Sequence, residues 1–306
     1  MSQLKMVTFN CRGLNNHTKR QKLFLWLEDH SYDIIFLQET FCTTKLEPYL
    51  KASWKGITFN AKSESSHSKG VSILLRKGFK YNIVKSHESD DGRIVIVSVE
   101  LSNNLIHLVS VYAPNTEAER IPFFEKLYNL CIKHCDNLNN VVIGGDLNIC
   151  RNLSDRYPKT NKKDKSIASF NNLLTKCKLI DLWQSQHGDS PGYTYFDKKN
   201  QSYSRLDYIL VPEHFCCKLN EISICDPVKQ TQVIDHSAIQ VSFSLNTDKR
   251  GPGYWKINNS ILSDEEYKNG VCKIIKDTKE VYKDLASHQL LWEIMKVNIK
   301  EYTILC

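Results

Sequence analysis

Short apolar, β-branched runs that end abruptly in polar side chains recur along this sequence and constrain its fold more than any other feature. They have the length and composition of buried strands, and cover residues 6–10, 33–39, 105–114, 140–148, 205–211 and 236–245. One polar ending is ordinary turn chemistry, but strands that end at one sheet edge would bring such groups together. The polar groups at these ends are Asn10, Glu39, Tyr112, Asn115, Asp146, Asn148, Asp207, Asp235 and His236.

Helical periodicity separates some of these strands, over residues 17–30, 117–136 and 166–178. Most other strands come in pairs that are joined by short turns, including the runs at 70–76 and 93–101. This mixture predicts an α+β fold in which two packed sheets are covered by helices, rather than a single parallel sheet.

The composition changes near residue 246. The stretch NTDKRGPGYW (246–255) is rich in turn residues, and 262–300 is charged and helix-favouring. We therefore predict a domain over residues 1–245, followed by a linker and a helical segment over 246–306.

The sequence has 11 cysteines, an odd number, at irregular spacings and without a CxxC pair. Nothing in this pattern resembles a disulfide framework, which indicates a protein of a reducing compartment. Cys131, His134 and Cys135 fall in an apolar-periodic stretch, so we interpret them as part of a buried helix face rather than a metal site. Without a signal pattern or a long apolar run, we expect an intracellular protein that is neither secreted nor bound to a membrane.

Charge gives a weaker indication of the partner. The 41 basic and 34 acidic residues leave a formal charge of +7. This excess suits a polyanionic partner, although many soluble proteins are as basic.

The polar strand ends have a coherent chemistry. Oxygen ligands such as Glu39, Asn10 and Asp207 suit Mg²⁺ or Mn²⁺, and one histidine beside carboxylates argues against zinc. The Asp235–His236 pair offers an oriented imidazole that can be cationic near neutral pH. A metal, a water-positioning carboxylate and an imidazole together suit attack on a phosphodiester.

Six segments, in order, resemble the endonuclease/exonuclease/phosphatase superfamily, whose fold is shared by apurinic endonucleases and DNase I. They are TFNCRGLN (8–15), IIFLQET (34–40), VSVYAPN (109–115), VVIGGDLNI (141–149), RLDYILV (205–211) and IDHSAI (234–239). The resemblance implies a four-layered sandwich of two mixed sheets flanked by helices. CRGLN, ETF, SRLDYIL and RGPGYWKINNSIL (250–262) further resemble the endonuclease domain of non-LTR, LINE-type retrotransposons.

The resemblance also implies roles for the polar strand ends. Glu39, helped by Asn10, would bind Mg²⁺ or Mn²⁺, and Asp146 would orient or activate the attacking water. Asn148 would hold the phosphate, and Tyr112 would donate a hydrogen bond to it. His236, with Asp235 beside it, would stabilise the transition state. Asp207 would orient His236 or a metal-bound group.

DNA contacts are expected around this site. Arg12 and Arg156 are basic candidates, and Thr194 would lie near the target-strand backbone. The polar segment FDKKNQSYS (196–204) corresponds to a hairpin that enters the minor groove in the retrotransposon enzymes, which adds Lys198, Lys199, Ser204 and Arg205. Ile234 stands where many superfamily members have serine, and we expect this difference to affect DNA-backbone contact more than chemistry.

These features predict a metal-dependent endonuclease that nicks one strand of double-stranded DNA in the nucleus. Its 3′-hydroxyl product would prime a reverse transcriptase in the same polyprotein. An apurinic repair endonuclease, a phosphatase and a catalytically inactive nucleic-acid-binding module remain alternatives. The segment at 250–262 argues against the first two, and the intact Glu39, Asp146, Asp207 and His236 argue against the third.

Overall fold

The computed structural model describes residues 3–101, 104–160, 164–227, 235–244, 259–283 and 287–305. The chain divides into two compact units, Met1–Thr247 and Asp248–Cys306. The boundary falls within the turn-rich stretch at 246–255. Within the described ranges, no helix combines the length and apolar character needed to cross a membrane.

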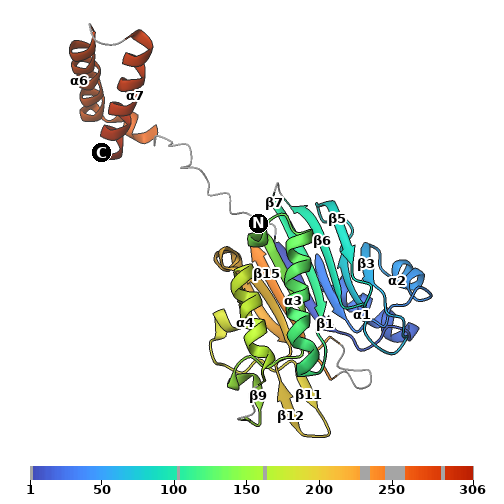
Figure 1. Cartoon of the computed structure of the whole chain (residues 1–306). Helices are drawn as coiled ribbons and strands as arrows, with labels where there is room; N and C mark the ends of the chain where they lie inside the picture. Colours follow the sequence, from blue (N-terminus) through green and yellow to red (C-terminus); the bar gives the residue numbers. More distant parts are fainter. Residues whose placement is uncertain are drawn as a thin grey trace. The chain divides into compact units, whose positions relative to one another are not determined.

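Two six-stranded mixed sheets form the first unit (Figure 1). In the first sheet β1 and β2 are parallel and the other neighbours antiparallel. Its order is β14 (Leu219–Cys225), β15 (Ala238–Ser244), β1 (Gln3–Asn10), β2 (Ile34–Gln38), β4 (Val71–Leu75) and β3 (Ile57–Ala61).

In the second sheet β7 and β8 are the parallel pair. Its order is β10 (Leu179–Asp181), β13 (Asp207–Pro212), β8 (Val141–Asp146), β7 (Asn104–Tyr112), β6 (Ile94–Leu101) and β5 (Asn82–Glu88).

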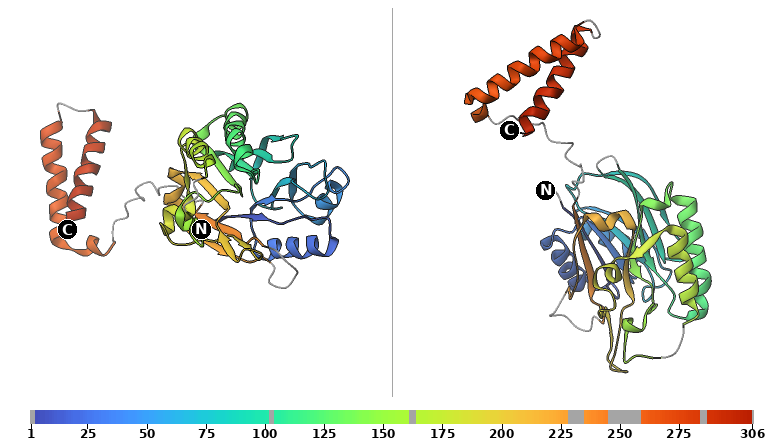
Figure 2. Two further views of the ribbon diagram at one scale, coloured as in Figure 1. Left: turned by 60° about the horizontal axis from the view of Figure 1, so that its bottom comes forward. Right: turned by 90° about the vertical axis from the view of Figure 1, so that its left-hand side faces the viewer.

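Helices cover the outer face of each sheet, which gives four layers (Figure 2). The first sheet packs against α1 (His17–Asp29) and α2 (Glu47–Ser53), and the second against α3 (Glu117–His134) and α4 (Ser166–Cys177). The predicted sandwich of two mixed sheets flanked by helices is confirmed. Shorter helices are η1 (Leu138–Asn140), η2 (Leu153–Asp155), α5 (Leu182–His187) and η3 (Glu213–Lys218).

The alternation of side chains along the strands explains the layers. In β1, Met6 joins the core between the sheets, whereas Val7 joins the core beneath α1. The sheets pack closely, since a Cβ on Gly144 would lie 2.5 Å from the ring of Phe36. Burial on both faces therefore accounts for the nearly unbroken apolar runs in the sequence.

A small third sheet extends from one end of this unit (Figure 1). It consists of β11 (Tyr195–Asp197), β12 (Ser202–Ser204) and β9 (Arg156–Tyr157), in that order. β11 and β12 form a hairpin with its turn at 198–201, within the segment where a loop or hairpin was predicted.

The second unit is a helical hairpin of α6 (Glu265–Tyr282) and α7 (His288–Leu305), preceded by η4 (Asn259–Ser263). The rings of Tyr267 and Tyr302 stack at 5.7 Å across the pair. A Cβ on Gly270 would lie 2.1 Å from the Tyr302 hydroxyl, so glycine permits this close approach. The helical prediction for 262–300 agrees with these two helices.

The ten described cysteines are free thiols. Cys131 lies on the buried face of α3, as predicted, and Cys135 directly follows the helix; both belong to the core beneath it. His134 instead stacks on His87 at 3.9 Å.

Candidate active site

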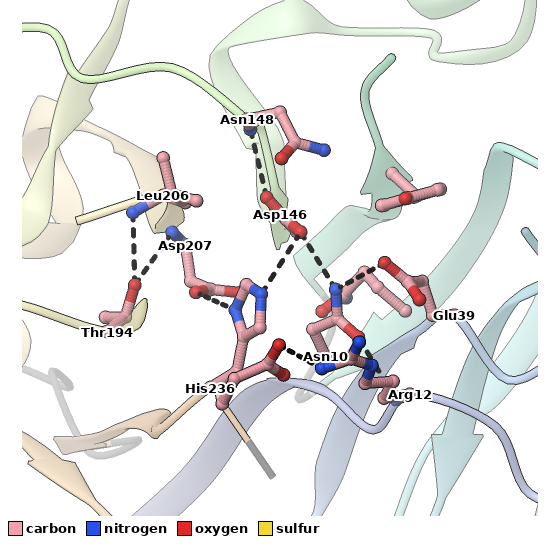
Figure 3. A network of polar contacts seen from close by, with 12 residues as sticks. Asn10, Arg12, Glu39, Asp146, Asn148, Thr194, Leu206, Asp207 and His236 are labelled. Atoms are coloured by element: carbon pink, nitrogen blue, oxygen red, sulfur yellow. Dashed lines mark hydrogen bonds and ion pairs between the residues drawn. The ribbon is translucent and has the colours of Figure 1, made fainter. Parts of the chain in front are cut away.

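The polar ends of strands from both sheets meet at one place (Figure 3). Asp146 is the last residue of β8, and the strand register pairs it with one residue on each of the two adjacent strands. It is paired with Tyr112 of the parallel β7 and with Asp207 of the antiparallel β13. Asn10 and Glu39 reach the same place from β1 and from the residue after β2. The sheet edge therefore gathers residues that are far apart in sequence.

Asn10 joins the two sheets at this site. Its buried Nδ2 donates to Oε1 of Glu39 at 3.1 Å and to Oδ2 of Asp146 at 2.9 Å. Its Oδ1 accepts a hydrogen bond from the backbone N–H of Arg12 at 3.1 Å. Glu39 has the unusual φ of 49°, which turns the chain as it leaves β2. Asn10 thus fixes the distance between two carboxylates on different sheets.

A second polar bridge lies behind Asn10. The hydroxyl of Thr8 donates to Oε1 of Gln38 at 3.3 Å, and Nε2 of Gln38 donates to the hydroxyl of Ser110 at 3.2 Å. All three side chains are fully buried, and they connect β1 and β2 with β7. This bridge fixes the two sheets relative to each other next to the site.

His236 lies between two aspartates. Its Nδ1 is 2.9 Å from Oδ2 of Asp207, and its Nε2 is 3.9 Å from Oδ2 of Asp146. Burial opposes a charge on His236, but the charge and hydrogen bond of Asp207 outweigh it and raise the pKa of the imidazole to about 9. Burial and then the charge of Asp207 raise the pKa of Asp146 to about 7. The histidine is therefore poised to carry a positive charge, and Asp146 to exchange a proton near neutral pH.

The site fits a divalent metal ion. Asp146, Asp207 and His236 offer ligand atoms that lie within 4.8 Å of one another. A protonated His236 can satisfy both aspartates by itself, so we favour the oxygen atoms around Glu39 and Asn10 for a hard cation. Oδ1 of Asp207 is buried without a hydrogen-bond partner among the described residues, which leaves negative charge to be balanced here.

Asn148 and Tyr112 are joined by Asn115, a polar strand end to which the sequence predictions gave no role. Nδ2 of Asn148 donates to the carbonyl of Ala113 at 2.8 Å and to Oδ1 of Asn115 at 3.0 Å. The Tyr112 hydroxyl donates to the same Oδ1 at 3.2 Å. Burial, then the charges of Glu39 and Asp146, raise the pKa of Tyr112, so it remains a hydroxyl donor. Asn115 was visible as a polar strand ending, which was the signal that could have found it.

Asp235 and Arg12 form an ion pair at the rim of the site. The Arg12 side chain is 51% exposed and that of Asp235 is 14% exposed, so the arginine is accessible to a ligand. Oδ1 of Asp235 is buried and has no hydrogen-bond partner within the described part of the chain. Ile234, which precedes this pair, lies outside the described residues.

Thr194 is buried and does not lie where a DNA backbone could reach it. Its hydroxyl accepts hydrogen bonds from the backbone N–H groups of Leu206 and Asp207, at 3.1 and 3.2 Å. Its carbonyl accepts a hydrogen bond from the N–H of Ser237 at 2.7 Å. Thr194 therefore ties the strand of Asp207 to the segment of His236.

Tyr195 is a neighbour of His236 that sequence reasoning missed. The two residues form an isolated β-bridge, and their rings lie 4.9 Å apart. No local pattern marks this contact, because it depends on pairing between segments 41 residues apart (236 minus 195).

The predicted DNA contacts divide into exposed and buried residues. Arg156, Lys198 and Lys199 are exposed on the small sheet and its hairpin turn. Arg205 is only 1% exposed, and Ser204 is also buried, so neither is placed to bind DNA. Nε of Arg205 lies 2.8 Å from Oδ1 of Asp155, and Nη2 lies 2.8 Å from Oδ2 of Asp181, an arrangement that anchors the base of the hairpin.

A cleft of about 880 Å³ opens beside Asn148. Arg151, Arg156 and Leu206 contribute to its lining, so it joins the candidate catalytic residues to the small sheet.

Residues 7–222 match the model of the Endonuclease/Exonuclease/phosphatase family. The chain belongs to this family. It is 29% identical, over 98% of its length, to the Xenopus laevis transposon TX1 uncharacterized 149 kDa protein, and spans 23% of that protein. Over 79% of its length it is 27% identical to recombination repair protein 1 of Drosophila melanogaster, of which it spans 37%. The chain therefore covers well under two thirds of either relative.

Solved structures share the fold. The AP endonuclease LMAP from Leishmania major superposes with a TM-score of 0.67 and 17% identity, over 79% of this chain and 88% of that one. The endonuclease domain of TRAS1, a telomere-specific non-LTR retrotransposon, gives a TM-score of 0.61 and 17% identity, over 80% and 99%. The chain thus shares its family and its fold with nucleases, and its relatives include a transposon protein and a DNA repair nuclease.

Proposed function

We propose that this protein is a metal-dependent endonuclease that nicks one strand of double-stranded DNA and leaves a 3′-hydroxyl to prime reverse transcription. The observation that carries the proposal is the contact of Asn10 with both Glu39 and Asp146, beside the Asp207–His236 pair. It sets a cation-binding carboxylate, a carboxylate with a raised pKa and a charged imidazole around one point, as phosphodiester hydrolysis requires.

Each buried group has a role in this reaction. Asp146 orients the attacking water and accepts its proton, which its raised pKa favours near neutral pH. His236, held in its charged form by Asp207, donates a hydrogen bond to the phosphoryl oxygen as negative charge grows there. When DNA binds, the Tyr112 hydroxyl exchanges its hydrogen bond to Asn115 for one to the same phosphate. Asn148 holds Asp146 by donating its backbone N–H to Oδ1 at 3.0 Å.

A Mg²⁺ or Mn²⁺ ion held by Glu39 and Asn10 would polarise the phosphodiester and stabilise the negative charge of the transition state. Arg12 contacts a neighbouring phosphate from the rim, with Asp235 holding its guanidinium in place before DNA binds. Arg156, Lys198 and Lys199 extend this cationic surface along the duplex, with the hairpin in the minor groove.

The retrotransposon role is supported by the similarity to the TX1 transposon protein, which extends past the first unit into residues 246–306. The resemblance of residues 250–262 to LINE-type retrotransposon proteins supports a reverse transcriptase in the same polypeptide as the partner we propose. Residues 246–306 would then be a linker and the helical start of a connector, and DNA cleavage would take place in the nucleus.

Relaxation of supercoiled plasmid tests this proposal. The full chain should convert supercoiled to nicked DNA with Mg²⁺ and not with EDTA, and a DNA polymerase should extend the nicks directly, without phosphatase treatment. Asp146→Asn and His236→Ala should each abolish nicking, whereas Asp189→Asn, on the exposed surface, should not. Equal nicking by wild type and Asp146→Asn would refute the mechanism.

The alternative function to be distinguished from the proposed one is that of a repair endonuclease, because recombination repair protein 1 is among the relatives. An oligonucleotide duplex with one abasic site, compared with the same intact duplex, distinguishes the two. Cleavage restricted to the abasic site would favour the repair function, and cleavage of the intact duplex at preferred sequences would favour the proposed one.

A further inference from the structure

The two faces of the small sheet carry different residues. Strand pairing aligns Tyr195 with Ser204 and Ser204 with Arg156, which sets these three side chains on one face. This face is turned toward the catalytic residues, because the ring of Tyr195 lies 4.9 Å from His236 and Ser204 is buried. The next residue of each strand therefore points to the opposite face.

That opposite face is a row of aromatic rings, formed by Phe196, Tyr203 and Tyr157. Phe196 and Tyr203 stack at 4.7 Å with an angle of 26° between their planes, and Tyr193 adds a ring at 5.7 Å from Tyr203. We call these four residues the aromatic face. Tyr157 is 58% exposed and Tyr203 is 41% exposed, whereas Phe196 and Tyr193 are half-buried.

Folding of the first unit does not account for the aromatic face. Its four residues belong to none of the three hydrophobic cores found among the described residues. Contiguous exposed rings of this kind mark interaction surfaces in soluble proteins, whereas single exposed aromatic residues are common.

The segments that carry these rings also carry exposed lysines. Lys198 and Lys199 are exposed at the turn of the hairpin, and Lys159 is exposed two residues after Tyr157. The nearby carboxylate of Asp197 is engaged within the turn, where it accepts hydrogen bonds from Nδ2 of Asn200 at 2.6 Å and from the N–H of Lys199 at 2.9 Å. An aromatic centre with a cationic rim complements stacked bases on a phosphate backbone.

We propose that the aromatic face binds an unpaired nucleic-acid strand, as a site separate from the catalytic one and beyond the proposed nicking activity. In a duplex the base faces are covered by one another, so open rings can stack only on bases that are unpaired. DNA and RNA share this chemistry, and the two are distinguished by experiment. Because the catalytic residues lie on the other side of the small sheet, this strand is distinct from the scissile one.

Fluorescence anisotropy in EDTA with the full chain tests the proposal, using labelled oligothymidylate, oligouridylate and a blunt duplex of equal length. Tyr157→Ala should weaken single-strand binding roughly five- to 150-fold, the usual effect of losing one stacked base. Its effect on duplex binding should be less than about twofold. Tyr157→Phe should bind like the wild type. The tighter of the two single-stranded ligands identifies the natural one.

Two further variants separate binding from folding. Tyr157→Leu keeps apolar contacts within the small sheet but cannot stack, so it should bind as weakly as Tyr157→Ala even if the alanine variant unfolds. Tyr49→Ala removes a tyrosine that is 61% exposed on α2 and should change nothing. Unchanged single-strand affinity in Tyr157→Leu, or an equal loss for the duplex, would overturn the proposal. If Tyr157→Leu impaired plasmid nicking but not single-strand binding, Tyr157 would belong to the catalytic site and the proposal would be wrong.

Discussion

His236 and Asp207 form a buried pair in which Nδ1 of the imidazole lies 2.9 Å from Oδ2 of the carboxylate. Only 8% of His236 and none of Asp207 is exposed. Burial by itself would keep the imidazole neutral, and the charge of Asp207 reverses that preference. Asp207 thus determines the charge that His236 can present to a phosphate.

The replacement Asp207→Asn should lower the pKa of His236 from about 9 toward or below its ordinary 6.5. With a pKa of about 9 the wild-type imidazole should be protonated at neutral pH, and the variant imidazole should be largely neutral there. An NMR titration of the imidazole in metal-free protein measures this directly. Asp226→Asn, which removes an exposed carboxylate bonded to Ser237, is the control and should leave the pKa unchanged. A pKa that stayed near 9 in Asp207→Asn would assign the effect to another group.

Sequence patterns predicted this site because of how sheets are built. Polar residues at the end of a buried strand are easy to recognise in a sequence. Asn10 and Asp146 are the last residues of β1 and β8, and Glu39 follows β2. Asp207 is instead the first residue of β13, which is antiparallel to β8, so it lies at the same edge of the sheet. Their convergence follows from strands that end at the same edge of each sheet. The distance between the sheets was not predictable, because it depends on cross-sheet packing such as that of Gly144 against Phe36.

Sequence reasoning failed where a residue's partners lie far away in the chain. Arg205 was predicted to bind DNA together with the polar hairpin segment at 196–204. Its partners Asp155 and Asp181 lie 50 and 24 residues away, and nothing local shows that they enclose it. Thr194 was misassigned for the same reason, since its hydroxyl is bonded to backbone groups of a later strand.

Thr194→Val should impair catalysis and stability together. The change is nearly isosteric, but it leaves the N–H groups of Leu206 and Asp207 without their acceptor. We expect a loss of about 1–3 kcal/mol in the free energy of unfolding, measured in urea, and a lower kcat because Asp207 is displaced. Thr194→Ser restores the hydroxyl and should recover both. If the valine variant lost DNA affinity with normal kcat and stability, the original prediction of a DNA contact would be favoured.

Arg205→Met should destabilise the first unit by about 3–5 kcal/mol, because it leaves the buried carboxylates of Asp155 and Asp181 without their cation. Urea unfolding measures the loss. Binding to duplex DNA, under conditions where the variant is folded, should keep the salt dependence of the wild type. A smaller salt dependence would show instead that Arg205 reaches a phosphate.

Lys199→Ala should weaken DNA binding without affecting stability, the reverse of what we expect for Arg205→Met. Lys199 is exposed at the hairpin turn, so its loss should change the free energy of unfolding by less than about 0.5 kcal/mol. If it contacts one phosphate, the slope of log affinity against log salt concentration should fall by about 0.9. An unchanged slope would remove Lys199 from the DNA-binding surface.

Replacing the turn at 198–201 with a Gly/Ser turn should broaden the choice of nicking site. The turn joins β11 to β12 at the tip of the hairpin, whereas the contacts of Thr194 and Tyr195 with the catalytic segment lie at its base. Nick positions mapped on plasmid DNA should become less selective while the rate of nicking changes less. Retained site preference in a normally folded variant would count against a role for the hairpin in target choice.

Glu39→Gln should raise the Mg²⁺ concentration needed for half-maximal nicking by roughly tenfold or more, because a neutral amide is a weaker ligand for a hard cation. The glutamine oxygen can still accept the hydrogen bond from Asn10, so the connection between the sheets should survive and stability should change little. A Mg²⁺ titration of plasmid nicking measures the midpoint, and Glu64→Gln, on the exposed surface, is the matched control. An unchanged midpoint with a lower maximal rate would move the cation from Glu39 to the Asp146–Asp207–His236 group, whose ligand atoms lie within 4.8 Å of one another.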